Sequence, residues 1–173
     1  RVKNNKEFLL IIEDHDEMRE YLCSLFKEDY NVIEAGNGEE GVAMADKYIP
    51  KLIISDIMMP VKDGFECSRE IRENKRTFHI PVIFLTAKAE DADRLKSLQI
   101  GVDDYIMKPF NPELLKEKVK ALIEQRDLLR KLYAKTLMLD EEVLESSEDV
   151  QDVFMPKMLQ IIEENLSNRN FTI

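Results

Sequence analysis

Two kinds of hydrophobic pattern alternate along residues 6–125 of the chain. Short apolar runs are typical of buried strands, whereas segments with an apolar residue every three or four positions are typical of amphipathic helices. Strands are predicted over residues 7–12, 31–35, 52–55, 82–85 and 105–107. Helices are predicted over residues 16–28, 39–47, 65–72 and 88–98, followed by a fifth that Asn111 caps and Pro112 begins.

This alternation of strands with helices indicates a parallel sheet that is covered by helices on both faces. Crossovers between parallel strands are expected to be right-handed. We therefore predict an α/β fold of the flavodoxin-like type, with five strands in the order 2-1-3-4-5, over residues 6–125.

The fifth predicted helix has no obvious end. Its apolar stripe comprises Leu115, Val119, Leu122, Leu129 and Tyr133. Arg126 occupies one position of that stripe, so the pattern is not a perfect coiled-coil seam. Two interpretations stay open: a helix that packs on the sheet and then frays, or a signalling helix that carries a dimer contact.

The remaining residues predict a linker and a second helical element. Residues 140–152 are acid-rich and include Ser146-Ser147, which is typical of a linker. Residues 153–166 have the spacing of an amphipathic helix, which is too short to bury its own apolar face. The predicted organisation is a domain at 6–125, an extended helix and acidic linker at 126–152, and the start of a helical output domain at 153–173.

Composition narrows the range of partners and locations. The net charge of -10 argues against general affinity for nucleic acid or anionic membranes. Neither a membrane-spanning stretch nor a signal peptide is evident, so we expect a cytoplasmic protein without membrane contact. Arg1 stands where a methionine would begin a complete chain, so a piece of a larger protein is expected. Cys23 and Cys67 are interpreted as buried, reduced thiols rather than metal ligands.

Candidate chemistry gathers where the predicted strands end. The first strand is followed by Glu13 and Asp14, the third by Asp56, the fourth by Thr86 and the fifth by Lys108. In an open parallel sheet, ligands bind outside the carboxyl ends of the strands. These side chains are therefore expected to lie in one pocket.

The residue types in that pocket suit phosphoryl transfer. Three carboxylates close together raise one another's pKa unless a cation lies among them, and oxygen ligands favour Mg²⁺. Lys108 offers a positive charge and Thr86 a hydroxyl for the oxygens of a phosphoryl group. Asp56 would be the nucleophile that forms an acyl phosphate. No glycine-rich phosphate loop is present, which argues against a nucleotide as the donor.

In combination, five motifs resemble the receiver domain of bacterial two-component response regulators. They are Glu13-Asp14, Asp56 with Met58-Met59-Pro60, Asp63-Gly64, Leu85-Thr86-Ala87 and Lys108-Pro109-Phe110. The resemblance covers residues 6–125 in order. It implies that Asp56 accepts phosphate from a phosphohistidine on the transmitter domain of a histidine kinase.

The resemblance also implies roles for the other pocket residues. Mg²⁺ would be held by Asp14, Asp56 and the backbone carbonyl of Met58, with Glu13 acting through water. The amine of Lys108 would pair with the phosphoryl oxygens and Thr86 would hydrogen-bond one of them. Tyr105 would be the switch aromatic that turns inward with Thr86.

Phosphorylation is then expected to change one surface, formed by the helix at 88–98, the strand at 105–107 and the helix from 112. A homodimer through that surface, or through the extended helix, is an expected assembly. Two positions depart from the family pattern or vary within it. Members of the family often have two aspartates where this chain has Glu13-Asp14, and Lys88 stands at a variable position that affects phosphate lifetime.

A weaker resemblance concerns the end of the chain. Residues 158–166 followed by Asn170-Phe171-Thr172-Ile173 are similar to the opening of an AraC-type helix-turn-helix domain. The DNA-reading helices are absent, so DNA contact is expected only through a missing C-terminal domain. The parent would be a hybrid two-component regulator of transcription, with sensor and histidine kinase parts upstream.

Simpler interpretations of single residues stay open. Asp14 and Thr86 would serve as helix caps, Lys108 as a surface lysine, and Tyr105 as an aromatic at the edge of the core. The side chains of Met58 and Met59 are expected to fill the core.

Two rival functions also stay open. A Mg²⁺-dependent phosphatase of the aspartyl-phosphate type usually has a second aspartate two positions after the nucleophile, where this chain has Met58. A pseudo-receiver would be an interaction module that is never phosphorylated. We expect no turnover enzyme in this fragment beyond its own phosphorylation and dephosphorylation.

Overall fold

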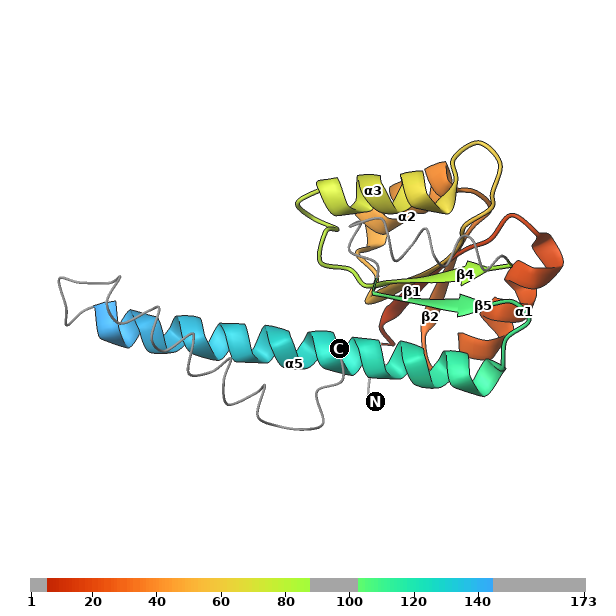
Figure 1. The fold of residues 1–173 in the computed structure, drawn as a ribbon. Coiled ribbons are helices and arrows are strands. Elements are labelled where there is room, and N and C mark those ends of the chain that lie inside the picture. The colour runs from red at the N-terminus through yellow and green to blue at the C-terminus, as the bar shows by residue number, and fades with distance from the viewer. Residues whose placement is uncertain (1–5, 88–102, 145–173) are drawn as a thin grey trace. The chain divides into compact units, whose positions relative to one another are not determined.

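The computed structural model describes residues 6–87 and 103–144, with side chains described as far as residue 132 (Figure 1). The chain divides into two units, of which the first ends at Asp127 and the second begins at Leu128. The predicted helix at 88–98, together with Lys88, and the predicted elements from residue 145 onward lie outside the described residues.

A single parallel sheet forms the centre of the first unit. Its five strands run in the order β2-β1-β3-β4-β5, which confirms the predicted α/β class and strand order. The strands are β1 (Phe8–Ile12), β2 (Asn31–Ala35), β3 (Leu52–Asp56), β4 (Val82–Thr86) and β5 (Asp104–Met107). From β1 the chain first adds β2 on one side and then adds β3, β4 and β5 on the other side, so the direction of strand addition reverses between β1 and β3. In sheets of this kind, ligands bind at the carboxyl ends of the two strands where this reversal occurs.

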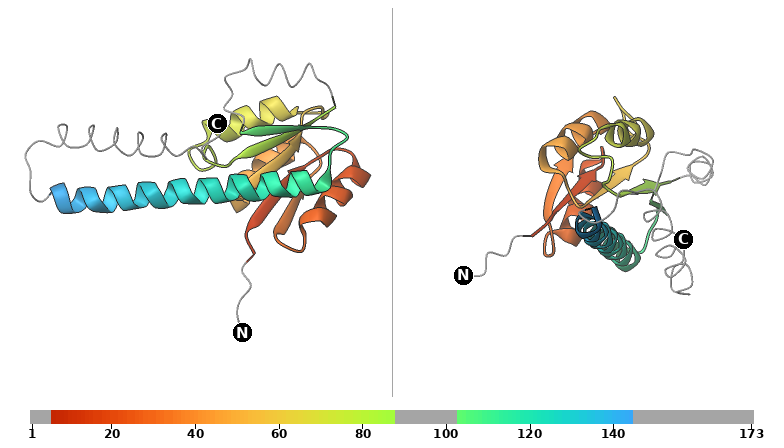
Figure 2. Two further views of the ribbon diagram at one scale, coloured as in Figure 1. Left: turned by 60° about the horizontal axis from the view of Figure 1, so that its bottom comes forward. Right: turned by 90° about the vertical axis from the view of Figure 1, so that its left-hand side faces the viewer.

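Helices cover both faces of the sheet (Figures 1 and 2). The described helices are α1 (Asp16–Phe26), α2 (Gly38–Tyr48), α3 (Gly64–Glu73) and α5 (Pro112–Leu144). Residues of α2 and α3 pack with Leu10, Ile53 and Phe84 on one face. Residues of α1 and of the first part of α5 pack with Ile11 and Ile54 on the other. The alternation of faces along each strand explains why the strands are apolar throughout.

Several boundaries differ from the predicted ones. Strands β3 and β4 each extend one residue further, because Asp56 pairs with Leu85 and Thr86 pairs with Met107 in the sheet ladder. The first helix ends at Phe26 rather than residue 28. Asp56 and Thr86 are therefore the last residues of their strands, and the sheet holds their backbones more firmly than a loop would.

The predicted linker at 140–152 needs a correction. Helix α5 continues to Leu144, so its last turn occupies the first part of that range. No glycine or proline occurs between Pro112 and Pro156, and glutamate and leucine are good helix formers, so nothing in the sequence stops the helix at residue 140.

Arg126, which interrupts the apolar stripe of α5, forms an ion pair next to the sheet. Its guanidinium binds the carboxylate of Asp103, which lies just before β5 and is almost completely buried. The same carboxylate binds Arg72 of α3 at 2.5 Å and accepts a hydrogen bond from the backbone N–H of Val82 at 2.9 Å. Arg126 is thus part of an ion-pair cluster at the amino-terminal edge of the sheet.

Both cysteines are free thiols, as predicted, although only Cys67 is fully buried and Cys23 is half-buried. Burial raises the pKa of each thiol to about 12, so neither is a reactive thiolate at neutral pH. Among the described helices, none offers an apolar stretch of the length that a bilayer crossing requires.

The loop between β3 and α3 contains a strained residue. Val61 has φ of 70°, a conformation that β-branched residues rarely adopt, and its side chain is 78% exposed. Replacing Val61 with asparagine, which tolerates this conformation, is expected to raise the free energy of unfolding by about 1 kcal/mol. Urea unfolding followed by circular dichroism measures the change.

Ile49 provides the matched control for this prediction. It also has positive φ, 46°, but its side chain packs against the core. Ile49→Asn should therefore lose packing energy that offsets the relief of backbone strain, with no net stabilisation. A Val61→Asn variant that is less stable than the parent chain would contradict the assignment of strain to Val61.

Candidate phosphoacceptor site

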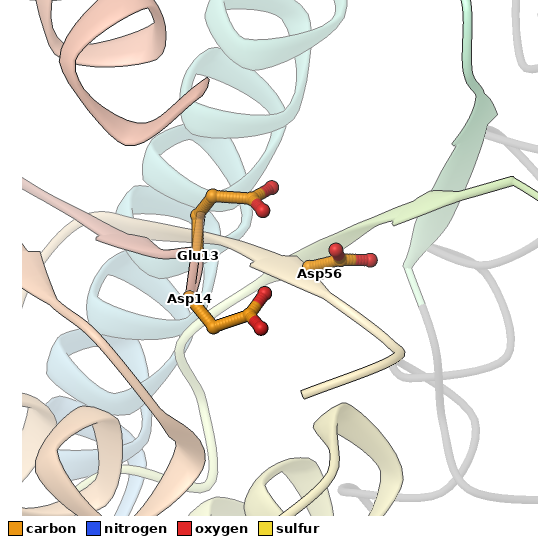
Figure 3. Close-up of side chains that lie close together, drawn as sticks. All are labelled: Glu13, Asp14 and Asp56. Atoms are coloured by element: carbon orange, nitrogen blue, oxygen red, sulfur yellow. The ribbon is translucent and has the colours of Figure 1, made fainter. Parts of the chain in front are cut away.

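Three carboxylates meet at the carboxyl ends of β1 and β3. Glu13 and Asp14 directly follow β1, and Asp56 is the last residue of β3. Their side chains project into the same space, with carboxylate oxygens within 4.8 Å of one another (Figure 3). Asp14 is exposed, whereas Glu13 and Asp56 are buried.

Lys108 reaches this cluster from the end of β5. Its Nζ lies 2.8 Å from Oε2 of Glu13 and 2.9 Å from Oδ2 of Asp56. The backbone N–H of Lys108 also donates to the carbonyl of Thr86 at 2.7 Å, which ties the ends of β4 and β5 together. An ordinary surface lysine would not have two buried carboxylates as partners.

Burial and charge set the electrostatics of the cluster. Burial is the main cause that raises the pKa of Glu13, and the charge of Asp56 adds to it, against the hydrogen bond from Lys108. For Lys108, burial lowers the pKa, but hydrogen bonds and charges from the two carboxylates outweigh it, so its pKa is raised overall. The ammonium of Lys108 is therefore charged and supplies part of the positive charge that the acids require.

The backbone around Asp56 is shaped by close packing. Its Oδ1 accepts a hydrogen bond from the N–H of Ile57 at 2.7 Å. The N–H of Gly64, at the start of α3, donates to the carbonyl of Ile57 at 2.9 Å. A Cβ at Gly64 would lie 2.4 Å from the carbonyl oxygen of Asp56, so only glycine permits this approach. Gly64 thus lets α3 begin directly beside the candidate nucleophile.

One expectation about this loop was wrong. The side chain of Met59 is buried as predicted, but that of Met58 is 55% exposed and does not fill the core. Met58 follows the end of β3, where the chain has left the helix-covered part of the sheet. The proposed role of its backbone carbonyl does not depend on the side chain.

Thr86 and Tyr105 lie on the adjacent strands β4 and β5. Thr86 is completely buried at the end of β4. Tyr105 pairs with Phe84 across the ladder, is half-buried, and packs against the core cluster on the α2–α3 face. The interpretation of Tyr105 as an aromatic at the edge of the core therefore fits its packing.

Asp14 is not the residue that caps α1. The N-cap position belongs to His15, whose side chain makes no capping hydrogen bond. The carboxylate of Asp14 is therefore not committed to a helix end. Together with Glu13 and Asp56 it provides a set of oxygen ligands of the kind that holds Mg²⁺, a hard cation that takes carboxylates and water.

Sequence reasoning missed one residue at this site. Arg19 of α1 donates from Nη1 to the backbone carbonyl oxygen of Glu13 at 2.8 Å. A basic residue in the first turns of a helix that follows an acidic pair is the only signal in the sequence, and that signal alone does not predict a contact with the backbone.

Comparison with known proteins identifies the family of this chain. The family described as "Response regulator receiver domain" matches residues 9–120. The chain belongs to this family, and it is a receiver domain of two-component signalling, a class phosphorylated on aspartate with Mg²⁺.

Among sequences, the chain is 35% identical over 172 residues to "Histidine kinase P4" of Formosa agariphila, covering 99% of this chain and 12% of that protein. It is 41% identical over 124 residues to the transcriptional regulatory protein ResD of Bacillus subtilis, covering 71% of this chain and 50% of that one. The chain therefore spans half or less of these relatives.

A similar solved structure is the receiver domain of sensor histidine kinase PA1611 from Pseudomonas aeruginosa PAO1, with a magnesium ion coordinated in its active-site cleft. It has 30% identity and a TM-score of 0.64, over 69% of this chain and 98% of that one. The receiver domain of a signal transduction histidine kinase from Syntrophus aciditrophicus has 35% identity and a TM-score of 0.63, over 69% and 91%.

Proposed function

We propose that Asp56 is the phosphoacceptor of this receiver domain. The observation that carries the proposal is the contact of one ammonium, that of Lys108, with both Glu13 and Asp56 inside a cluster of three carboxylates. The ammonium can pair with the negative oxygens of a phosphoryl group, and the three carboxylates can bind a divalent cation.

The proposed reaction takes the phosphoryl group from a phosphohistidine of a histidine kinase transmitter domain. A carboxylate oxygen of Asp56 forms a bond to phosphorus while the bond from phosphorus to the histidine nitrogen breaks, and the imidazole leaves with that electron pair. Asp14, Asp56 and the carbonyl of Met58 would hold Mg²⁺, with Glu13 acting through water. The bound ion would supply positive charge to the phosphoryl oxygens.

Lys108 and Thr86 would then respond to the new group. Lys108 is already placed to move from the carboxylate of Asp56 to a phosphoryl oxygen on the same side chain. The hydroxyl of Thr86 would donate a hydrogen bond to another phosphoryl oxygen. Tyr105 on the neighbouring strand would move inward together with Thr86. This shifts the balance between two conformations of the surface that includes β5 and α5.

We further propose that residues 6–125 are the receiver domain, 126–152 the connection, and 153–173 the start of an AraC-type output domain. The parent would be a hybrid two-component protein with DNA contact through a missing C-terminal part. The length of the match to "Histidine kinase P4", which extends over nearly the whole chain, supports such a parent. A homodimer through α5, or through the surface that it shares with β5, is the proposed assembly.

Nuclear magnetic resonance with beryllofluoride, a phosphate mimic, tests the proposed response. Addition of beryllofluoride and Mg²⁺ is expected to shift the amide resonances of Thr86, which ends the strand next to Asp56, and of Tyr105 on the strand beyond it. Addition of Mg²⁺ alone should shift resonances near Asp14 and Asp56 and leave Tyr105 nearly unchanged. Unchanged spectra around Thr86 and Tyr105 with both reagents would refute the proposed response.

Hydrolysis of a generic phosphate ester separates the receiver from a phosphatase. The exposed Met58 stands where a phosphatase of the aspartyl-phosphate type usually carries its second aspartate. We therefore expect no sustained Mg²⁺-dependent turnover. Steady turnover that stops on replacement of Asp56 would favour the phosphatase instead.

A further inference from the structure

Arg19 connects α1 to the backbone of the acidic pair. Its Nη1 donates to the carbonyl oxygen of Glu13 at 2.8 Å, and its Nη2 binds Asp16 at 2.5 Å. Its Nε lies 3.5 Å from Oε2 of Glu34 at the end of β2, and its side chain is only 19% exposed. One guanidinium therefore joins three segments of the chain next to the site.

The contact with Glu13 falls on the peptide bond that joins the two acids. The N–H of Glu13 donates to the carbonyl of Ala35, the last residue of β2, at 3.1 Å. The Glu13 carbonyl lies beyond the paired residues of β1, and Arg19 is its donor. With both backbone groups of Glu13 hydrogen-bonded, the peptide plane that leads to Asp14 is fixed, and with it the direction in which Asp14 leaves the strand.

Arg19 also offsets charge beside the site. A cavity of about 460 Å³ adjoins Asp14, and its lining includes Asp16, Glu34 and Glu40. Among the residues that line it, Arg19 is the one basic side chain. Without Arg19, the carboxylates of Asp16, Glu34 and Glu40 would have no basic neighbour in the cavity lining, and they would compete with the site for a divalent cation.

We propose that Arg19 is a positioning residue for the Mg²⁺ site. It holds the Glu13–Asp14 peptide so that Asp14 faces Asp56, and it neutralises the neighbouring acids. This inference rests on the proposed function, because it assigns Arg19 to the same cation site. Arg19 contacts the backbone of Glu13 rather than the carboxylates of the site, so its effect should appear in metal affinity.

Titration with Mg²⁺, followed by isothermal calorimetry and by amide spectra of the acidic pair, tests the proposal directly. Arg19→Ala is expected to weaken Mg²⁺ binding about tenfold, as is typical when a group that orients a ligand is removed. Arg19→Lys keeps the charge and one donor, so its affinity should lie between those of Arg19→Ala and the parent chain. The amide resonances of Glu13 and Asp14 should shift in Arg19→Ala even without metal.

Arg76→Ala is the matched control, because Arg76 forms an exposed ion pair with Asp46 away from the site. Its Mg²⁺ affinity should stay within twofold of the parent chain. Urea unfolding of all variants separates binding from stability. If Arg19→Ala loses stability but keeps its Mg²⁺ affinity, or if Arg76→Ala weakens binding equally, the proposal is overturned.

Two further results complete the test. If Arg19→Ala does not fold, Arg19→Lys decides: unchanged affinity and unchanged Glu13 and Asp14 resonances overturn the proposal, and a loss of affinity with those resonances shifted supports it. Failure of the proposed function would look different, because the parent chain would then bind Mg²⁺ without becoming phosphorylated. The affinities of the variants could still be compared in that case.

Discussion

Replacing Asp56 with asparagine is expected to reduce phosphorylation by acetyl phosphate roughly a thousandfold or more, because the proposed nucleophile is removed. Asparagine has nearly the same shape, and its carbonyl oxygen can still accept the hydrogen bond that Ile57 donates to Oδ1. The fold should therefore persist. Intact mass measurement counts the phosphoryl groups, and loss of the label in hydroxylamine identifies an acyl phosphate.

Asp63→Asn is the control for this experiment. Asp63 lies in the same loop, and its side chain caps α3 by accepting a hydrogen bond from the N–H of Glu66 at 2.8 Å. Asparagine caps helices about as well as aspartate, so phosphorylation should be unchanged. Labelling of Asp56→Asn at the rate of the parent chain would show that another residue is the acceptor.

The second large effect is expected for Asp103→Ala, which should lower the free energy of unfolding by about 3 kcal/mol. The Asp103 carboxylate binds Arg72 and Arg126 and accepts the N–H of Val82, so its removal leaves two guanidinium groups without their shared anion. Both its side chain and that of Arg72 are largely buried, which makes the loss costly. Urea unfolding measures it.

Asp104→Ala provides the comparison, since Asp104 is the next residue and also forms an ion pair. Its partner is Lys118, and both side chains are partly exposed to solvent. Exposed ion pairs contribute at most about 1 kcal/mol, so the loss should be small. Equal losses in the two variants would contradict the assigned importance of the buried cluster around Asp103.

The sheet and the three acids were predictable for the same physical reason. Buried parallel strands are apolar along their whole length, so the polar residue that ends each run is conspicuous. Glu13 and Asp56 were found in this way, and the order of the strands then required them to be neighbours. The contact of Lys108 with both acids was beyond such reasoning, because it depends on distances across three strands.

The buried cluster around Asp103 could not be predicted at all from the sequence pattern. Arg126 was visible only as a gap in an apolar stripe, and Asp103 as one acid in a loop. To predict their ion pair, one must know which residue of α5 lies next to the start of β5, and the sequence pattern does not give this. The prediction that the side chain of Met58 fills the core was wrong for a related reason. Hydrophobicity alone does not indicate where the chain leaves the part of the sheet that helices cover.

The Lys108 ammonium has a consequence for the resting protein. Because this amine bridges Glu13 and Asp56, the protein itself supplies a counterion for two of the three acids. Repulsion between these acids is therefore relieved from within. The same two contacts also link the ends of β1, β3 and β5, so a single side chain joins three strands at the carboxyl edge of the sheet.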